Sequence, residues 1–343
     1  MEKSIAVATD TNSGIMQEEA ERLGVHVVPM PFVVDGEECL EGVNLDAERF
    51  YERQIAGADI VTSQPSIVDL GKRWAELLEA YDEVVYIPMS SGLSGSCETA
   101  CQVAAHCNGR VHVVDNQRIS VTQREAVLDA LRWIGEGRTA AETCALLEST
   151  KLDASIYLMV DTMAYLHKSG RITPAAAAIG SVLKIKPVLQ IQGEKLDAFS
   201  VAKSFKAAKR TMVKALSRDV RERFGGVDGV HLYVAHTNRD EDAQAFADEV
   251  RAHFGTDDVY VDRLPLSIAC HVGPGALGIG SASSRRAAGC RLPFLTGFAH
   301  WRRPRVPFLR PVSSVERPLH RRCRWLPAGS GPGRPARPRA CRR

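Results

Sequence analysis

The sequence lacks the features that would place it in a membrane or outside the cell. Its 343 residues contain no run of about 18 apolar residues, so we expect no stable membrane insertion. The opening MEKSIAVATDTNSG has too short an apolar core for an export signal. The nine cysteines include no CxxC pair. These absences favour a cytoplasmic protein with reduced thiols.

Signatures of nucleotide and metal sites are also missing. Neither a P-loop nor the glycine fingerprint of a dinucleotide-binding fold occurs, which argues against nucleotide binding by this chain. Cys97 and Cys101 stand four residues apart on a predicted helix, but small buried cysteines explain this spacing better than a metal site does. We therefore expect no metal.

Charge is distributed very unevenly. Residues 281–343 hold sixteen Arg, no Lys and one acidic residue, Glu316, which gives +15. Since the whole chain carries +3, the first 280 residues carry −12. An Arg- and Pro-rich segment of this kind cannot bury a core, so we expect a disordered basic tail.

Two interpretations of the tail remain open. It could be a basic arm for nucleic acid, or it could be GC-rich DNA read in a shifted frame. A natural basic arm usually mixes Lys with Arg, which favours the shifted frame. The acidic body would repel phosphate, so we expect no nucleic-acid partner.

Strand-like and helix-like segments alternate before the tail. The predicted strands are residues 4–9, 26–34, 84–89, 111–114, 156–160, 187–192, 230–235 and 259–261. The predicted helices are residues 16–23, 46–56, 67–80, a helix starting near 96, then 123–134, 140–148, 163–168, 175–183, 203–223 and 240–253. In the first half this alternation predicts a largely parallel α/β sheet. We expect two α/β domains, residues 1–152 and 153–280, followed by the tail, residues 281–343.

One loop has the composition of an anion site. Residues 90–95, SSGLSG, join an apolar strand to a helix that starts near Ser96. Backbone N–H groups and the positive end of a helix meet in such a loop, and its serine hydroxyls add neutral donors. The same residues also suit an ordinary strand-to-helix turn with serine caps.

Five segments together carry a resemblance to a known family. They are Thr62-Ser63-Gln64-Pro65-Ser66, Ser90-Ser91-Gly92-Leu93-Ser94-Gly95, Lys168-Ser169-Gly170-Arg171-Ile172, Leu183-Lys184-Ile185-Lys186-Pro187-Val188-Leu189 and His271-Val272-Gly273-Pro274-Gly275-Ala276-Leu277-Gly278. In this order and spacing they resemble the DegV family, the bacterial fatty-acid-binding subunits of a fatty-acid kinase system. The resemblance covers about residues 4–280.

The resemblance implies a carrier that holds one long-chain fatty acid in a tunnel between two domains. The residues expected around the carboxylate are Thr62, Ser94 and His271, with Ser63, Ser91 and Gly92 beside them and able to help through backbone N–H groups. A partner fatty-acid kinase would phosphorylate the bound acid for phospholipid metabolism. The chain itself would then be no enzyme, and the fatty acid would be its only ligand, with no other cofactor.

Two basic residues belong to the same resemblance. It places Arg171 near the head group and the kinase-facing surface. Lys203 stands where the family commonly has Arg, and Lys lacks the planar bidentate fork of Arg. A mostly uncharged cradle of hydroxyls would suit a carrier, because a tightly paired Arg would make the carboxylate less nucleophilic.

The end of the folded part departs from the family. There the chain closes with a strand after the glycine-rich segment, whereas here Gly280 runs directly into the Arg-rich tail. We therefore expect an incomplete last strand and a looser structure near His271.

A serine hydrolase is the main alternative. Gly92-Leu93-Ser94-Gly95-Ser96 nearly matches the nucleophile elbow G-x-S-x-G, with Ser94 as the nucleophile. Asp262 and His271 follow in the order that α/β-hydrolases use. The last position of the elbow is Ser96 instead of Gly, which disfavours this alternative.

Overall fold

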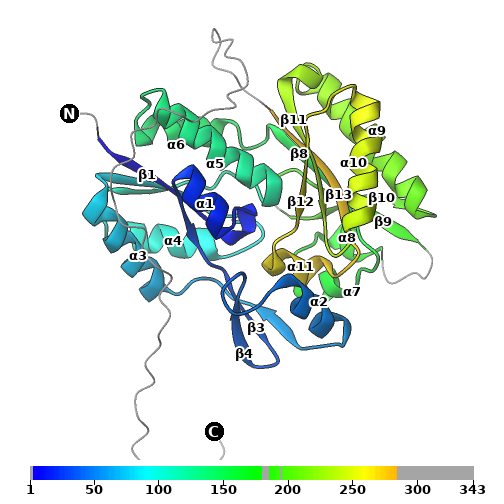
Figure 1. Cartoon of the computed structure of the whole chain (residues 1–343), viewed down its shortest axis with the longest axis horizontal. Helices are drawn as coiled ribbons and strands as arrows, with labels where there is room; N and C mark the ends of the chain where they lie inside the picture. The colour runs from blue at the N-terminus through cyan, green and yellow to red at the C-terminus, as the bar shows by residue number, and fades with distance from the viewer. Residues whose placement is uncertain (1–2, 180–184, 194, 284–343) are drawn as a thin grey trace, which may run out of the picture. The chain divides into compact units, whose positions relative to one another are not determined.

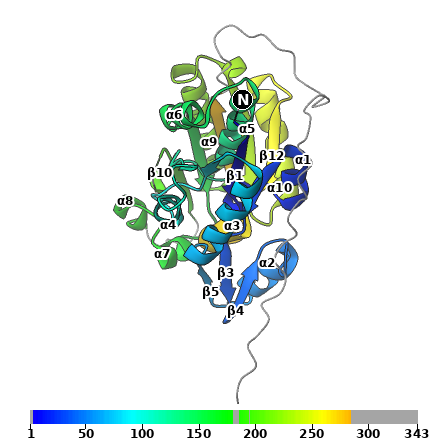
Figure 2. The ribbon, with the colours of Figure 1, turned by 90° about the vertical axis from the view of Figure 1, so that its left-hand side faces the viewer.

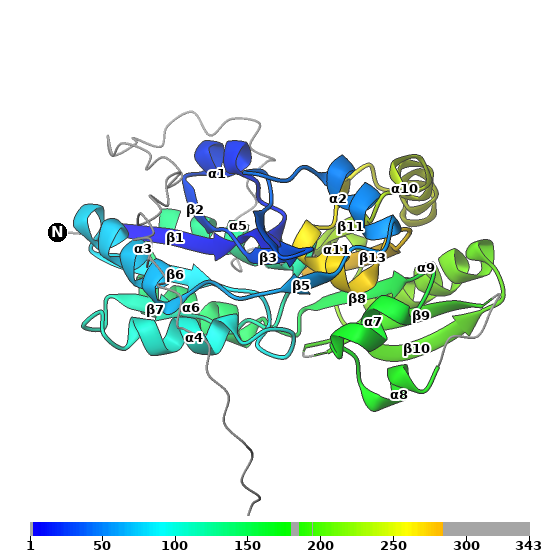
Figure 3. The ribbon, with the colours of Figure 1, turned by 90° about the horizontal axis from the view of Figure 1, so that it is seen from below.

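Two larger sheets and one small sheet organise the chain. The computed structural model describes residues 3–179, 185–193 and 195–283. The first sheet has the strand order β2 (Val25–Val28), β1 (Ile5–Asp10), β6 (Glu83–Ile87), β7 (Val111–Val113) and is parallel throughout. Figures 1 and 3 show its strands on the left, with the second sheet on the right.

Helices cover both faces of the first sheet because side chains on both faces of its strands are apolar. The helices of this half are α1 (Gln17–Leu23), α2 (Ala47–Ile55), α3 (Ile67–Ala80), α4 (Ser96–Ala104), α5 (Ser120–Gly135) and α6 (Ala140–Ser149), with a 3-10 turn η1 (Thr11–Ser13). Val84 and Tyr86 pack with residues of α3 and α4, while Val85 and Ile87 pack with residues of α5 and α6. This alternation is what a strand buried on both faces requires.

The small sheet is antiparallel and was not expected. Its order is β4 (Glu37–Leu40), β3 (Pro31–Val34), β5 (Ile60–Thr62). It lies with α2 at the lower end of the molecule in Figure 2. The prediction of one strand over residues 26–34 is wrong, because Pro29 and Pro31 interrupt it and divide it between two sheets.

The second sheet is mostly antiparallel. Its order is β10 (Asp197–Ala202), β9 (Lys186–Ile191), β8 (Ala154–Met159), β13 (Leu277–Ser283), β11 (Val230–His236), β12 (Val259–Arg263). Only the β11–β12 pair within it is parallel. The largely parallel sheet expected for the first half is therefore present, and the second sheet has a different topology.

Helices pack against both faces of the second sheet, and one of these faces also turns toward the interior. The helices of this half are α7 (Ala164–Ser169), α8 (Pro174–Ala177), α9 (Phe205–Glu222), α10 (Asp240–Phe254) and α11 (Leu266–Val272), with a 3-10 turn η2 (Val227–Gly229). Tyr157 and Met159 pack with α9 and α10, whereas Leu158 points to the opposite side. Part of the predicted helix 175–183 lies outside the described residues.

The mixed α/β class is confirmed, and the predicted boundary at residue 152 falls between α6 and β8. As a boundary between domains it stays a prediction. The predicted disordered tail lies, from residue 284 on, outside the described residues. None of the helices within the described ranges is long and apolar enough to cross a bilayer.

The expectation of an incomplete last strand is wrong. β13 is seven residues long, continues past Gly280 to Ser283, and pairs with β8 on one side and β11 on the other. Six of its seven residues are buried. The strand nearest to the tail is therefore a central strand of the sheet.

Replacing Leu277 tests this placement. Leu277 lies in β13, is fully buried and packs in the core under α9 and α10. We expect Leu277→Ala to lower the free energy of unfolding by about 2–5 kcal/mol in urea denaturation. Val201→Ala on the edge strand β10, where Val201 is 49% exposed, serves as the control and should change it by less than about 0.5 kcal/mol. Equal small effects would contradict a central, packed β13.

Candidate functional site

The carboxyl ends of the first sheet's parallel strands meet at one edge and face the second sheet. The turn after β1 carries Asn12, the loop after β6 carries Ser94, and the segment after β7 leads to Ile119. Loops at the carboxyl ends of parallel strands are the usual place for a ligand in an α/β fold. All three of these residues line one cavity.

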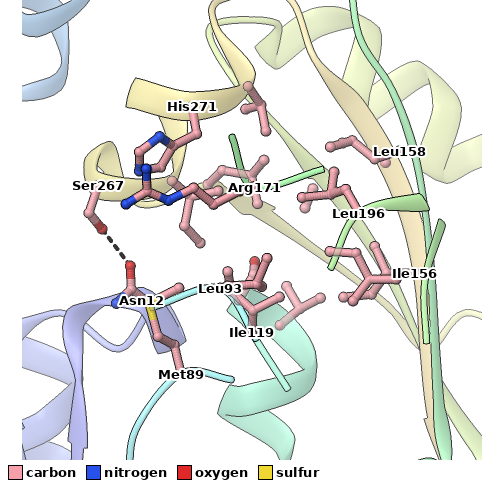
Figure 4. A pocket seen from close by; sticks show the side chains of 18 of the residues that line it. Asn12, Met89, Leu93, Ile119, Ile156, Leu158, Arg171, Leu196, Ser267 and His271 are labelled. Atoms are coloured by element: carbon pink, nitrogen blue, oxygen red, sulfur yellow. Dashed lines mark hydrogen bonds between the residues drawn. The ribbon is translucent and has the colours of Figure 1, made fainter. Parts of the chain in front are cut away.

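The cavity contains about 910 Å³ of empty space, counting the part open to solvent. Its apolar lining residues are Met30, Met89, Leu93, Ile119, Val121, Ile156, Leu158, Ile191, Leu196, Ala235, Leu264, Ile268, Val272 and Ile279. In Figure 4, Ile156, Leu158 and Leu196 lie on one side and His271, Ser267 and Asn12 on the other. The cavity is therefore polar at one end and apolar at the other.

Thr62 and His271 meet at the polar end. Thr62 is the last residue of β5, and its Oγ1 lies 3.0 Å from Nε2 of His271 on α11. The chain turns sharply after α11 at Gly273, which has a φ of +74°. A Cβ there would lie 2.3 Å from the ring of Tyr165, so this turn requires glycine. The predicted neighbourhood of Thr62 and His271 is thus present in the structure.

Ser94 and Ser63 both line the cavity, and the two loops that carry them approach each other. The Gln64 side chain donates a hydrogen bond of 2.8 Å to Oγ1 of Thr99 on α4. A Cβ on Gly95 would lie 2.8 Å from Oε1 of Gln64, and glycine at that position therefore allows the close approach. Ser63 is exposed and Ser94 is partly exposed, so the polar end lies near the protein surface.

Arg171 brings a positive charge to the cavity. It follows Gly170, which ends α7, and its Nη1 donates to the carbonyl oxygen of Ser169. Figure 4 shows its guanidinium beside His271. Among the described lining residues it is the one that is charged at neutral pH, because His271 is neutral there. Its charge makes the cavity suitable for an anion.

Burial, together with the charge of Arg171, controls the protonation of His271. Loss of solvation lowers the pKa of the imidazole from 6.5 to about 4, and the nearby guanidinium acts in the same direction. At neutral pH the ring therefore has one N–H donor and one acceptor nitrogen. It can exchange a hydrogen bond with Thr62 and still donate to, or accept from, a ligand.

Three predicted residues lie outside the cavity lining. Ser91 is exposed and turns to Asp115, with its Oγ 2.5 Å from Oδ2 and its N–H 3.1 Å from Oδ1. The N–H of Gly92 donates to Oγ of Ser90. Lys203 is an exposed residue between β10 and α9. The backbone donors predicted at Ser91 and Gly92 are used within the protein, which corrects that part of the prediction.

The sequence did not single out several lining residues. Oγ of Ser267 donates to Oδ1 of Asn12 at 2.6 Å, joining α11 to the turn after β1. Ser120, the first residue of α5, also lines the cavity. The polar turn after the first strand was a signal for Asn12. Ser267 carried no such signal, because α11 has only seven residues and was not predicted.

The residues of the alternative hydrolase do not form a triad. In the described part of the chain His271 pairs with Thr62, and no hydrogen bond joins it to Ser94 or Asp262. Asp262 lies on β12, does not line the cavity, and burial raises the pKa of its carboxyl to about 6. A triad needs both of the missing hydrogen bonds, so the geometry does not support nucleophilic catalysis.

Cys97 and Cys101 do not gather other ligands around them. Both lie on α4, with Cys97 buried and Cys101 exposed. Within the described ranges no group of three or more His, Cys, Asp or Glu side chains could hold a metal ion.

The low pKa of His271 predicts a pH dependence of stability. Between about pH 6.5 and pH 4 the unfolded chain takes up a proton at this residue and the folded protein does not. The contribution of His271 to the free energy of unfolding is therefore present at neutral pH and falls as the pH drops through this window. We expect the free energy of unfolding, measured by urea denaturation, to fall between about pH 7 and about pH 4.5. This fall should be larger for the wild type than for His271→Gln. Equal losses would show that His271 titrates normally in the folded protein.

Known proteins resemble the chain over nearly all of its described length. Residues 4–284 match the family described as "Uncharacterised protein, DegV family". Protein DegV of Bacillus subtilis is 32% identical over 279 residues, covering 80% of this chain and 98% of that protein. A DegV domain-containing protein of Deinococcus radiodurans is 31% identical, covering 80% and 97%. A DegV family protein of Thermus thermophilus has a solved structure with a TM-score of 0.75 and 30% identity, covering 82% of this chain and 99% of that one. The chain therefore belongs to the DegV family.

Proposed function

We propose that this protein binds a long-chain fatty acid in the cavity, with the carboxylate at the polar end and the acyl chain along the apolar lining. The observation that carries the proposal is a mostly apolar cavity in which Thr62 and His271 lie 3.0 Å apart. Its lining also includes Ser94 and Arg171. Each of these polar groups can donate a hydrogen bond, and Arg171 adds the charge that complements a carboxylate.

Burial of the acyl chain would supply most of the affinity. Roughly 15 methylenes at about 0.8 kcal/mol each contribute on the order of 12 kcal/mol before the costs of binding. A carboxylate without partners would lose several kcal/mol on leaving water. The hydroxyls of Thr62 and Ser94 and the guanidinium of Arg171 offset that loss.

Two relatives support this ligand class. The structure of the Thermus thermophilus protein is described as fatty acid binding by a DegV family protein. The solved structure of Bacillus subtilis DegV, called a fatty acid binding protein, has 30% identity and a TM-score of 0.74 to this chain, covering 82% of it and 99% of that chain. Both similarities extend over the segments that carry the cavity.

We further propose that the protein is a carrier, not an enzyme, and presents the carboxylate to a cytoplasmic fatty-acid kinase. Ser63 is exposed at the polar end, so a carboxylate bound there would lie near the surface and within reach of a second protein. The carrier would supply no nucleophile, since the acid oxygen itself attacks the phosphate. A kinase-facing role for Lys203 stays a prediction.

Bound lipid is the first test of this function. Native mass spectrometry of the purified full chain should show one bound mass that disappears when the protein is unfolded. Extraction should then release a long-chain fatty acid in an equimolar amount. An empty protein that also fails to take up added octadecanoic acid would contradict the proposal.

Removing the Thr62 hydroxyl should weaken binding of the acid. Thr62→Val keeps the side-chain shape and removes a hydrogen-bond donor to the carboxylate, so we expect the Kd for octadecanoic acid to rise roughly 10- to 100-fold. Isothermal titration calorimetry measures both Kd values. For octadecanol, which has no carboxylate, Thr62→Val should raise the Kd less than it does for octadecanoic acid. Ser91→Ala is the matched control, because Ser91 lies outside the cavity lining. Loss of binding in Ser91→Ala but not in Thr62→Val would place the head group elsewhere.

Acyl phosphate formation tests the carrier role. With a fatty-acid kinase, ATP and bound octadecanoic acid, trapping with hydroxylamine should yield the hydroxamate only when both proteins are present. Ser94→Ala should leave any esterase background unchanged, since no triad exists around Ser94. Hydroxamate formed by this chain and ATP alone would show that the chain is itself the enzyme.

A further inference from the structure

Ser120 combines two unfavourable features in the wall of the cavity. It is the first residue of α5 and has a φ of +54°, in the left-handed region that side chains other than glycine's rarely adopt. Its side chain is 4% exposed, and its Oγ has no hydrogen-bond partner. Buried hydroxyls in folded proteins are almost always bonded. A glycine at this position would avoid both features. A partner for this hydroxyl must therefore come from outside the chain, for example from a bound ligand.

The other hydroxyls among the described lining residues have partners. Ser267 donates to Asn12, Thr62 pairs with His271, Ser63 donates to the carbonyl of Gln64, and Ser94 accepts from the N–H of Ser96. Ser120 differs from all four. Its free hydroxyl is therefore specific to one position and not a general property of the cavity wall.

The start of α5 adds donors beside this hydroxyl. α5 has 16 residues, and Ile119, Ser120 and Val121 at its beginning all line the cavity. The first N–H groups of an α-helix have no partner within the helix and lie at its positive end. The buried hydroxyl and the helix end together can bind an oxygen atom.

The neighbours of Ser120 in the chain are apolar lining residues. Ile119 and Val121 both belong to the hydrophobic cluster that contains Leu93 and Leu158. A Cβ on Gly280 would contact both Val121 and Ile156. An oxygen bound between Ile119 and Val121 would therefore have apolar side chains around it, as a substituent on the acyl chain would.

We propose that Ser120 and the N-terminus of α5 bind an oxygen substituent on the acyl chain, so that the preferred ligands are hydroxy or oxo fatty acids. This inference rests on the proposed function and specifies its ligand. A neutral oxygen fits better than a second carboxylate, because Arg171 is the one charged lining residue among those described and the proposed function already pairs it with the carboxylate.

The test compares octadecanoic acid with hydroxyoctadecanoic acids whose hydroxyl stands near the head, at mid-chain or near the tail. Titration calorimetry on the lipid-free full chain should show one positional isomer binding about tenfold tighter than octadecanoic acid. Ser120→Ala should abolish this preference and leave the affinity for octadecanoic acid within about twofold. Ser120→Gly should abolish it too while raising the Tm, because glycine accepts the left-handed φ. Ser267→Ala, which removes a cavity hydroxyl that is already bonded, should retain the preference.

The outcomes separate this inference from the proposed function. If octadecanoic acid binds and no isomer is preferred, or if Ser120→Ala and Ser120→Gly keep the preference, the inference is overturned and the carrier function stands. If Ser120→Ala lowers the affinity for all the acids equally, Ser120 is a head-group contact. That result also overturns the inference. If no acid binds to the wild type, the proposed function fails and the inference fails with it.

Discussion

A buried carboxylate holds together the edge of the first sheet from which the cavity is built. Asp10 ends β1 and is fully buried. It accepts hydrogen bonds from the N–H of Met89 after β6, from Nε2 of Gln123 on α5, and from the backbone and side chain of Asn12. Burial raises the pKa of this carboxyl, and the four donors act in the opposite direction. One side chain thereby fixes the relative positions of three segments that contribute lining residues.

The second sheet contributes differently. Its outer face is occupied by α9 and α10, and its inner face carries Leu158, Leu189 and Tyr233 in the core cluster that also surrounds the cavity. Residues of α7, α8 and α11 belong to the same inner cluster, so this sheet also has helices near both faces. The cavity forms where Ile156 and Leu158 of this sheet face the carboxyl-end loops of the first sheet.

Local patterns in the sequence predicted much of the fold. α3 begins and ends where predicted, because Ser66 caps it and its apolar residues recur at helical spacing. The pairing of β8, β9 and β13 could not be predicted in the same way, since strand order depends on contacts between distant segments. A short helix such as α11 likewise leaves too little periodicity to detect.

The site was predictable where a motif carried the information. Thr62, Ser94 and His271 came from the family resemblance, and the structure brings them to one cavity. The direction of Ser91 was not predictable, because it depends on Asp115 from a different loop. The Asn12–Ser267 bond joins residues 255 positions apart, and nothing in either local sequence indicates it.

The central place of β13 has a consequence for synthesis on the ribosome. The first sheet uses strands that all emerge before residue 114, so it has every strand it needs while the rest is still being translated. β8 and β11 cannot be bridged until β13, the last strand of the described chain, has left the exit tunnel. Until then both present unpaired edges, which are templates for wrong pairing with other nascent chains. Completion of the cavity wall therefore waits for β13, which is translated more than 160 residues after β7.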